Sequence, residues 1–447
     1  MDFLKNKGVL FYTLSVLSLV GYYSIAYEIN RWQTMPLFLT FGLLFGLFVV
    51  MMRWATLKHI FIFGIVCRLL LFWELPALSQ DFYRFIWDGN LQLLGINPYL
   101  YTPNTLIDII QFPLSRELYE GMGGLSASHY SNYPPLSQWM YRLAAYANTG
   151  EIQHLVVVLK AFVLGGEIIA FFFGKALLKF LKLPVHWIGW YFLNPLVVVE
   201  ISGNVHGEGL MVGFLLAGLY ALFKKQTVLG ALLLAISIGV KLLPLLLLPV
   251  FFRFLTRKTY LFFTSLIIIF SFLIWFPFWE NQADQNYFET IRLWFNTFEF
   301  NGSLYYIIRE IGYEIEGYNI IRKLGKVTPY LVMAIVLAFT FLRRNRTPED
   351  LLKSMLLVLS VYFFMATTVH PWYLVTLVAL GSLTGYAFPL VWSATVLFSY
   401  SAYGLDTVAE QPVWIFLEYV LMYACFAYEM VKGPLLHHFQ KIHFRSA

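Results

Sequence analysis

Apolar segments long enough to cross a lipid bilayer recur along the chain and restrict what it can fold into. Hydrocarbon offers no hydrogen-bond partner to a polypeptide backbone, so a segment that crosses it must be an α-helix or part of a closed barrel. Stretches of about 20 apolar residues suit helices. Charged residues make up 13% of the chain, against about 25% in soluble proteins. The sequence therefore predicts an all-α polytopic membrane protein with about 12–14 transmembrane helices.

The predicted spans lie at roughly these residues: 9–28, 35–52, 59–78, 152–178, 186–201, 205–223, 227–240, 242–255, 259–279, 327–342, 351–369, 372–386, 388–403 and 413–431. Two neighbouring spans, on either side of Lys241, are too short to cross alone as straight helices. Irregular backbone at membrane depth is tolerated only where protein or a water-filled cavity surrounds it. We therefore expect these two segments to meet at Lys241 and Pro244 and to line a cavity there.

The distribution of basic residues predicts which side of the membrane each turn faces. With the N-terminus in the cytoplasm, the cytoplasmic turns and span ends receive Arg53, Lys58, Lys175, Lys179, Lys182, Lys224, Lys225, Arg253, Arg257, Lys258, Arg343, Arg344, Arg346, Lys353, Lys432, Lys441 and Arg445. The short turns on the other side hold only Arg31 and Lys241. Basic residues favour cytoplasmic turns, and this rule accounts for the net charge of +6 without a nucleic-acid partner.

Two long loops interrupt the spans, at 79–151 and 280–326, and both fall on the external side. Loops of this length in a compact protein are usually functional. We expect residues 1–447 to form a single integral membrane domain, in which both external loops carry short amphipathic helices.

Polar residues from distant parts of the sequence arrive at this same external face. They are Asp81, Arg84 and Asp88, the segment 128–138 with Tyr133, the turn with Asn204, His206 and Glu208, and then Lys241 and His370. Charged groups near hydrocarbon are costly and are usually functional. Their convergence predicts one polar site at the external interface, covered by the two loops.

Several of these residues also allow a structural interpretation. Arg84 stands at helical spacing from both Asp81 and Asp88 and could simply form an ion pair with one of them. His206 and Glu208 resemble a metal-binding pair but lack a clear third ligand.

Other polar residues have structural alternatives of the same kind. Tyr133-Pro134-Pro135 could be a rigid turn, Lys241 could extend to the interface, and His370 could belong to an aromatic belt. Three further charged residues fall inside spans, where we expect them to pair within the bundle: Arg68, Lys160 and Glu167.

In order along the chain, five short motifs resemble those of the polytopic C-superfamily (GT-C) glycosyltransferases, which take sugar from a polyprenyl phosphate. They are "SQDFYRFIWDGNLQLLGINPY" from Ser79, "YPPL" from Tyr133, "LNPL" followed by "GNVHGEG", "GVKLLP" around Lys241, and "HPWYL" from His370. The chain is most similar to bacterial polyprenyl-phosphate-mannose-dependent mannosyltransferases and, more distantly, to the first mannosyltransferase of GPI-anchor assembly. The family often shows two adjacent acids where this chain has Gln80-Asp81.

The resemblance implies transfer of a hexose, with mannose expected, from a polyprenyl-phosphate sugar to a hydroxyl of a glycan or lipid-linked acceptor. It implies inversion with Asp81 as the base, and a location in the bacterial inner membrane with the site on the periplasmic side. The candidates for binding the donor phosphate are Arg84, Lys241 and His370. Those for binding sugar or acceptor are Trp87, Asp88, Tyr133, Asn204, His206, Glu208 and Trp372. We expect no cofactor, and a divalent metal is not favoured, because cationic side chains can offset a single lipid phosphate.

Two other functions remain open. A transporter or flippase for lipid-linked saccharides would also need many spans and buried polar groups, although its site should lie nearer the bilayer midplane. A polymerase or ligase of lipid-linked glycans would share the same lipid-phosphate chemistry and differ in the size of its donor.

Overall fold

The computed structural model describes residues 7–405 and 407–437, so Lys441 and Arg445 lie outside the described residues. Its helices run in this order: α1 Lys7–Tyr27, α2 Thr34–Met51, α3 Leu57–Leu70, α4 Asp81–Leu93, α5 Pro103–Leu106, α6 Ser115–Ala127, α7 Pro135–Ala145, α8 Ile152–Phe180, η2 Val185–Ile188, α9 Gly189–Phe192, α10 Pro195–Val197, η3 Val198–Gly203, α11 Glu208–Phe223, α12 Thr227–Val240, η4 Leu243–Arg253, α13 Arg257–Trp275, η5 Phe276–Phe278, α14 Ala283–Thr297, α15 Leu304–Glu316, α16 Ile321–Leu342, α17 Pro348–Met365, η6 Pro371–Leu374, α18 Val375–Thr384, α19 Phe388–Thr395, η7 Val396–Ala402 and α20 Pro412–Lys432.

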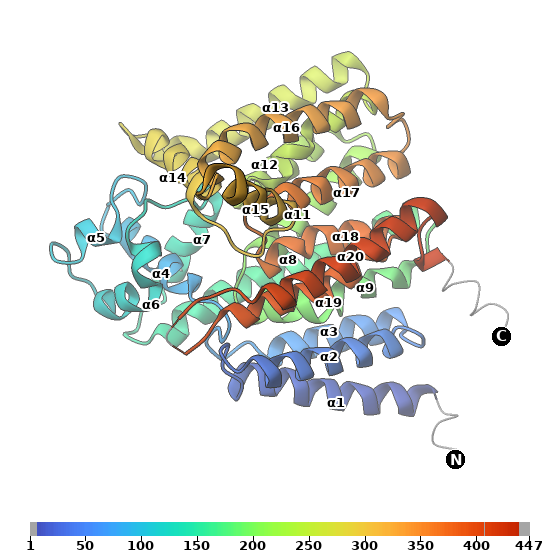
Figure 1. Ribbon diagram of the computed structural model, residues 1–447, viewed down its shortest axis with the longest axis horizontal. Coiled ribbons are helices and arrows are strands. Elements are labelled where there is room, and N and C mark those ends of the chain that lie inside the picture. Colours follow the sequence, from blue (N-terminus) through green and yellow to red (C-terminus); the bar gives the residue numbers. More distant parts are fainter. Residues whose placement is uncertain (1–6, 406, 438–447) are drawn as a thin grey trace.

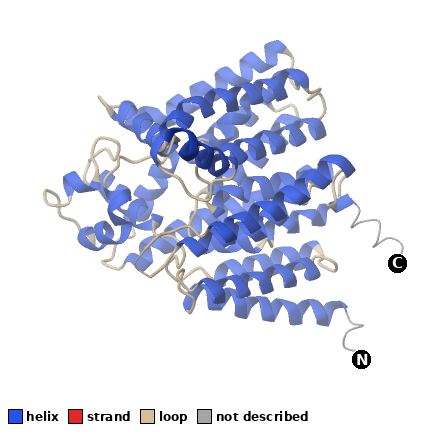
Figure 2. Cartoon of the chain, viewed as in Figure 1, coloured by secondary structure: helices blue, strands red, loops and turns tan. Residues whose placement is uncertain are grey.

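The long helices lie side by side, and the elements of the two long loops gather at one end of them. Figure 1 shows α4, α5, α6 and α7 as a lobe at the left, with α14 and α15 beside it, while both chain ends lie at the right. Figure 2 shows the described chain as helices joined by loops. The predicted all-α class is confirmed.

Six of the described helices are long and apolar enough to cross a membrane: those at 8–27, 34–51, 152–180, 257–278, 321–342 and 412–432. A seventh crossing is possible if Pro195–Gly203 and Glu208–Phe223, which meet at 113°, form one broken span. The protein is therefore a multi-pass membrane protein. Fewer helices than the expected 12–14 meet this test, because several apolar stretches form shorter helices. One example is η4, where Pro244 and Pro249 interrupt regular α-helix.

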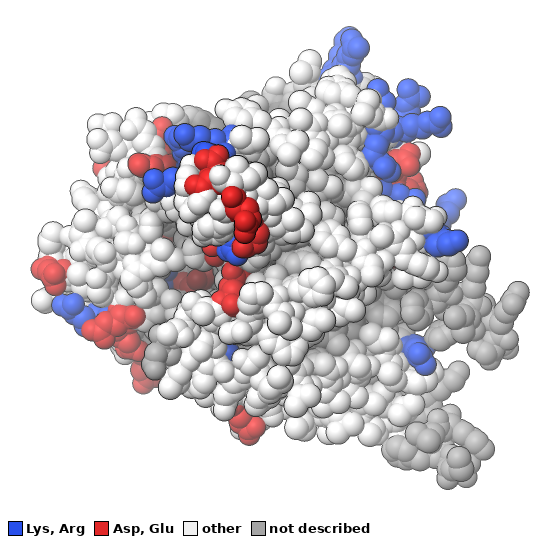
Figure 3. Space-filling view, in the orientation of Figure 1, with Lys and Arg blue, Asp and Glu red and all other residues white. Residues whose placement is uncertain are grey.

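Charged side chains are distributed unevenly between the two ends of the bundle. On the face shown in Figure 3, Lys and Arg gather at the end that carries the chain termini, whereas most Asp and Glu lie toward the α4–α7 lobe and α15. This separation matches the pattern that the positive-inside rule predicts for a membrane protein.

A buried ion pair joins three helices in the core. Arg68 of α3 pairs with Glu167 of α8, and both side chains have no exposed surface. Tyr191 of α9 donates its hydroxyl hydrogen to Glu167 at 2.5 Å, and Arg68 donates to the carbonyl of Phe192 at 3.0 Å. The expected pairing of Arg68 and Glu167 within the bundle is confirmed.

Removing one partner of this pair leaves the other charge buried without compensation. We expect Glu167→Leu to destabilise the protein by about 3–5 kcal/mol, whereas Arg68→Met with Glu167→Leu should restore much of that loss. Thermal unfolding of both variants in the same detergent checks this expectation. A single variant as stable as the double variant would contradict it.

Candidate functional site

Asp81 is the first residue of α4, where the chain enters the α4–α7 lobe. The backbone N–H of Asp81 donates to the hydroxyl of Ser79 at 3.3 Å, which fixes the chain just before the helix. A carboxylate in the first turn is favoured by the positive end of the helix dipole. The remainder of α4 is almost entirely buried, so the position of Asp81 is set by the packing of the whole lobe.

Three charged groups from other parts of the chain act on Asp81. Burial raises the pKa of Asp81, Lys241 lowers it, Glu208 raises it and Arg31 lowers it, and together these influences leave it at about 6. A carboxyl with a pKa near 6 is mostly ionised at neutral pH and is still basic enough to accept a proton efficiently. The carboxyl group of Asp81 is therefore ionised at neutral pH and more basic than that of an ordinary aspartate.

Lys241 and Glu208 form an ion pair beside Asp81. Helix α12 ends at Val240, so Lys241 adopts an extended conformation at the break before η4. Glu208 lies in the first turn of α11 and is 1% exposed, whereas the side chain of Lys241 is 27% exposed. The ammonium group lies over the ring of Tyr373, 5.2 Å from its centre. The expected meeting of the two short segments at Lys241 is confirmed, and the side chain of Lys241 is the partly exposed member of the pair.

A stack of rings lies next to this pair. The ring of Trp372 is sandwiched between His206, with centroids 3.8 Å apart, and His370, with centroids 4.4 Å apart. Phe300, from the second long loop, covers His370 at 4.9 Å. Burial and, to a smaller extent, the charge of Lys241 together lower the pKa of His370 to about 3, so His370 is a neutral imidazole here. Among the described residues, nothing hydrogen-bonds Nδ1 of His370 or Nε2 of His206.

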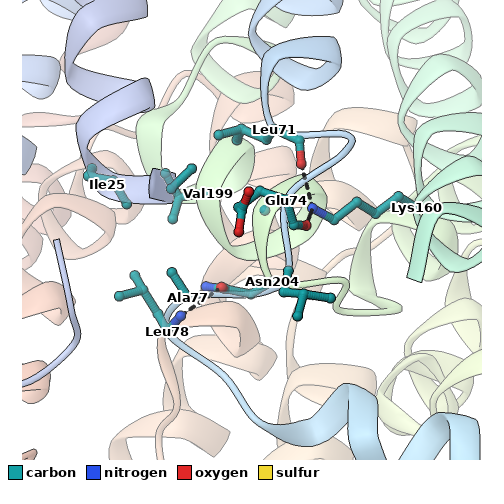
Figure 4. Close-up of a pocket in the computed structure, with 11 residues that line it drawn as sticks. Ile25, Leu71, Glu74, Ala77, Leu78, Lys160, Val199 and Asn204 are labelled. Carbon is teal, nitrogen blue, oxygen red and sulfur yellow. Dashed lines mark hydrogen bonds between the residues drawn. The ribbon is translucent and has the colours of Figure 1, made fainter. Parts of the chain in front are cut away.

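Asn204 holds the chain segment that leads to Asp81. Its amide oxygen accepts the backbone N–H of Leu78 at 3.1 Å, and its amide nitrogen donates to Glu200 at 3.1 Å. Tyr400 also donates to Glu200, at 2.6 Å. Figure 4 shows the bond from Leu78 to Asn204 beside a small pocket that Lys160 also lines. This geometry gives Asn204 a positioning role.

The same pocket accounts for Lys160, the third charged residue expected inside a span. Its ammonium group donates to the backbone carbonyls of Leu71 and Glu74. Lys160 thus anchors the connection between α3 and α4, since those carbonyls belong to the chain that leaves α3.

The structural interpretation of Arg84 and Asp88 is the one that the structure shows. Arg84 pairs with Asp88 at 2.7 Å and donates to the carbonyls of Ser126 and His129 at 2.6 and 3.0 Å. Asp88 also accepts from Ser131 and Gln138, at 2.6 and 2.9 Å. These bonds tie α4 to α7 and to the loop before it. Of the three guanidinium nitrogens of Arg84, Nη2 alone has no hydrogen-bond partner among the described residues.

The two aromatic residues proposed from the first loop are placed differently. Trp87 is 0% exposed and packs against Phe112 at 5.2 Å, within the core of the lobe. Its placement gives no support to contact with a sugar. Tyr133 packs edge-on against Phe85 at 4.9 Å, and Asp81 contributes to the raised pKa of its hydroxyl, after burial. Tyr133 thus faces the site.

Arg31, which has no predicted role in the site, lies close enough to Asp81 to act on its carboxyl group. Arg31 donates to Gln80 at 3.2 Å, and its guanidinium lies 4.8 Å from the ring centre of Tyr403. A signal was present in the sequence, because Arg31 and Lys241 are the two basic residues on short turns opposite the basic side. Arg31 and Lys241 both lower the pKa of Asp81.

Comparison with known proteins adds an independent observation. A sequence model of a protein family described as "Alpha-(1->6)-mannopyranosyltransferase, N-terminal domain" matches residues 17–257, a range that includes Asp81, Glu208 and Lys241.

Two similar curated proteins carry the name Alpha-(1->6)-mannopyranosyltransferase A. The one from Mycobacterium tuberculosis is 26% identical over 192 residues, which cover 38% of this chain and 31% of the relative. The one from Corynebacterium glutamicum is 25% identical over 177 residues, which cover 39% of this chain and 34% of the relative. The chain thus spans about a third of the length of the curated relatives it matches. Because the family model covers more than half of the chain, the protein belongs to the alpha-(1->6)-mannopyranosyltransferase N-terminal domain family.

Proposed function

We propose that the protein is a membrane mannosyltransferase that moves mannose from a polyprenyl phosphate to a hydroxyl of a glycan or lipid-linked acceptor, with inversion. Family membership and the names of the relatives support a mannosyl transfer. The observation that carries the proposal is a half-buried carboxylate, Asp81, that interacts electrostatically with a partly exposed cation, Lys241. These two groups supply what the reaction needs, a base for the acceptor hydroxyl and a positive charge for the leaving phosphate.

Each group then has a defined task. Asp81 takes the proton of the acceptor hydroxyl while the hydroxyl oxygen bonds to the anomeric carbon and the bond from that carbon to the phosphate oxygen breaks. Lys241 stabilises the negative charge that develops on the departing lipid phosphate. His370 is neutral and contributes a hydrogen bond rather than a charge. Arg84 stays in the ion pair with Asp88, where it supports α4.

The sugar is held by the groups around the ring stack. Tyr133 offers a ring surface to the sugar, and His206 offers a polar atom to its hydroxyl groups, whereas the ring of Trp372 is covered by His206 and His370 and orders the stack. Asn204 acts through the segment before Asp81. The loops 79–151 and 280–326 cover this site on the periplasmic side of the inner membrane, where the lipid phosphate lies at headgroup depth.

A transporter or a polymerase of lipid-linked saccharides stays the alternative. A transporter does not need a general base, whereas Asp81 has the environment of one. Sugar transfer from polyprenyl-phosphate mannose by the purified protein separates these functions, since a flippase would move the donor without consuming it.

Replacing Asp81 tests the base directly. We expect Asp81→Asn to lower kcat by about 10²–10⁴-fold, the contribution typical of a general base, and to retain donor binding. Asp108→Asn is a matched control, because Asp108 lies in the same loop and is exposed. Activity of Asp81→Asn within a few-fold of wild type would remove Asp81 from this role.

The pH dependence of the reaction should report the ionisation of Asp81. Since burial raises its pKa to about 6, the base is available above that pH, and kcat/KM should fall as the pH drops through it. Lys241 lowers this pKa, so Lys241→Met should move the acidic limb to higher pH. The same variant should raise the donor KM about 10- to 100-fold, through loss of a charge-assisted bond.

Two further variants test donor binding. His370→Ala should also raise the donor KM. Lys323→Met, at an exposed position of α16, should change neither the donor KM nor the pH of the acidic limb. An unchanged donor KM in both Lys241→Met and His370→Ala would argue against phosphate binding by these residues.

We propose that transfer needs no divalent metal. Lys241 offsets the charge of a single lipid phosphate, and no group of three His, Cys, Asp or Glu side chains within the described ranges could hold a metal ion. Activity of the purified protein should therefore survive exhaustive chelation. Activity that disappears with EDTA and returns with Mg²⁺ or Mn²⁺ would overturn this proposal.

A further inference from the structure

We infer that Glu208 is the resident counter-ion of Lys241 and competes with the lipid phosphate for it. This inference rests on the proposed function and deepens it, because it assigns Glu208 to control of donor and product binding rather than to contact with the sugar. Glu208 is thus a positioning residue that acts through Lys241.

The ion pair is built asymmetrically, which is what a competition requires. Glu208 is fixed: it lies in the first turn of α11, is 1% exposed and bonds Lys241 through Oε1. Lys241 extends from a helix end and keeps 27% of its side chain exposed. An incoming anion can therefore reach the lysine but not the glutamate.

The unpaired atoms of the pair support the same assignment. Oε2 of Glu208 is buried, and the described part of the chain offers it no hydrogen-bond partner. Glu208 thus has few other interactions in the site and depends on Lys241 for compensation. When a phosphate draws Lys241 away, the positive N-terminal end of α11 still stabilises the carboxylate. The cost of separating Lys241 from Glu208 weakens donor binding. After transfer, the return of Lys241 to Glu208 aids release of the lipid phosphate.

The competition also couples donor binding to the base. Lys241 and Glu208 act on the pKa of Asp81 with opposite sign, so Glu208 offsets part of the effect of Lys241 while the pair is intact. A bound phosphate adds a negative charge beside Lys241, and a nearby negative charge makes a carboxylate more basic. The other charged or titratable groups that interact with Asp81 are Arg31, Glu200, Tyr133, Tyr141, Tyr373 and Tyr403. Asp81 is thereby strongest as a base when the donor is in place.

The test is the binding of polyprenyl phosphate, the product, and of polyprenyl-phosphate mannose to the purified full-length protein. We expect Glu208→Gln to bind both lipids about tenfold more tightly, the scale of one hydrogen-bonded charge, and to turn over more slowly because product release is slower. Glu117→Gln is the matched control, since Glu117 is also a first-turn acid but is exposed. Weaker or equal lipid binding by Glu208→Gln would overturn the inference.

A pH profile gives a readout that a purely structural role would not move. Because Glu208 raises the pKa of Asp81, Glu208→Gln should shift the acidic limb of kcat/KM to lower pH. An unshifted limb would contradict the inference.

A second comparison remains informative if Glu208→Gln alone fails to fold. The double variant Lys241→Met with Glu208→Gln leaves neither charge unpaired, and because it has no lysine to compete for, its lipid binding should equal that of Lys241→Met alone. A further loss there would assign Glu208 to direct contact and overturn the inference. Failure of the wild-type protein to bind either lipid would instead refute the proposed function.

Discussion

The site depends on the ion pair between Glu208 and Lys241, which joins the first turn of α11 to the end of α12. A charge at the end of a membrane-embedded helix needs a partner, because uncompensated burial is costly. The partner here is itself buried, so the lysine is held at a defined place while part of its side chain stays exposed. The electrostatic environment of Asp81 follows from this arrangement, as both members of the pair act on its carboxyl group.

The second long loop contributes to the site through backbone pairing. The backbone N–H of Val369 donates to the carbonyl of Phe300 at 2.9 Å, and the backbone N–H of Phe300 donates to the carbonyl of Thr367 at 3.0 Å. This short contact places the ring of Phe300 over His370. The loop is in turn tied to α20, since Asn301 donates to Glu418 at 3.1 Å. The ring stack next to Lys241 is thus stabilised from the far end of the sequence.

Periodicity and charge distribution predicted the fold class and the residues that converge, because hydrophobicity and the positive-inside rule act on the sequence directly. Helix lengths were less predictable, since proline positions such as Pro244 and Pro249 decide where an apolar stretch departs from α-helix. The roles of Arg84 and Trp87 could not be settled by spacing. Every residue of α4 from Phe82 to Gln92 except Tyr83 is buried, so no solvent-facing side distinguishes residues that face the site from those that pack in the lobe.

The two basic residues that depart from the charge rule carry more information than those that obey it. Lys and Arg on the cytoplasmic side are explained by orientation in the membrane, whereas Arg31 and Lys241 need another reason. Each is placed where it acts on the same carboxyl group, and both lower its pKa. Arg31 is held by Gln80, the residue before Asp81, and Lys241 by Glu208. Glutamine at position 80 leaves Asp81 without an adjacent acid and gives Arg31 a neutral partner. The positive charge of Arg31 therefore stays available to Asp81 instead of being neutralised by its neighbour.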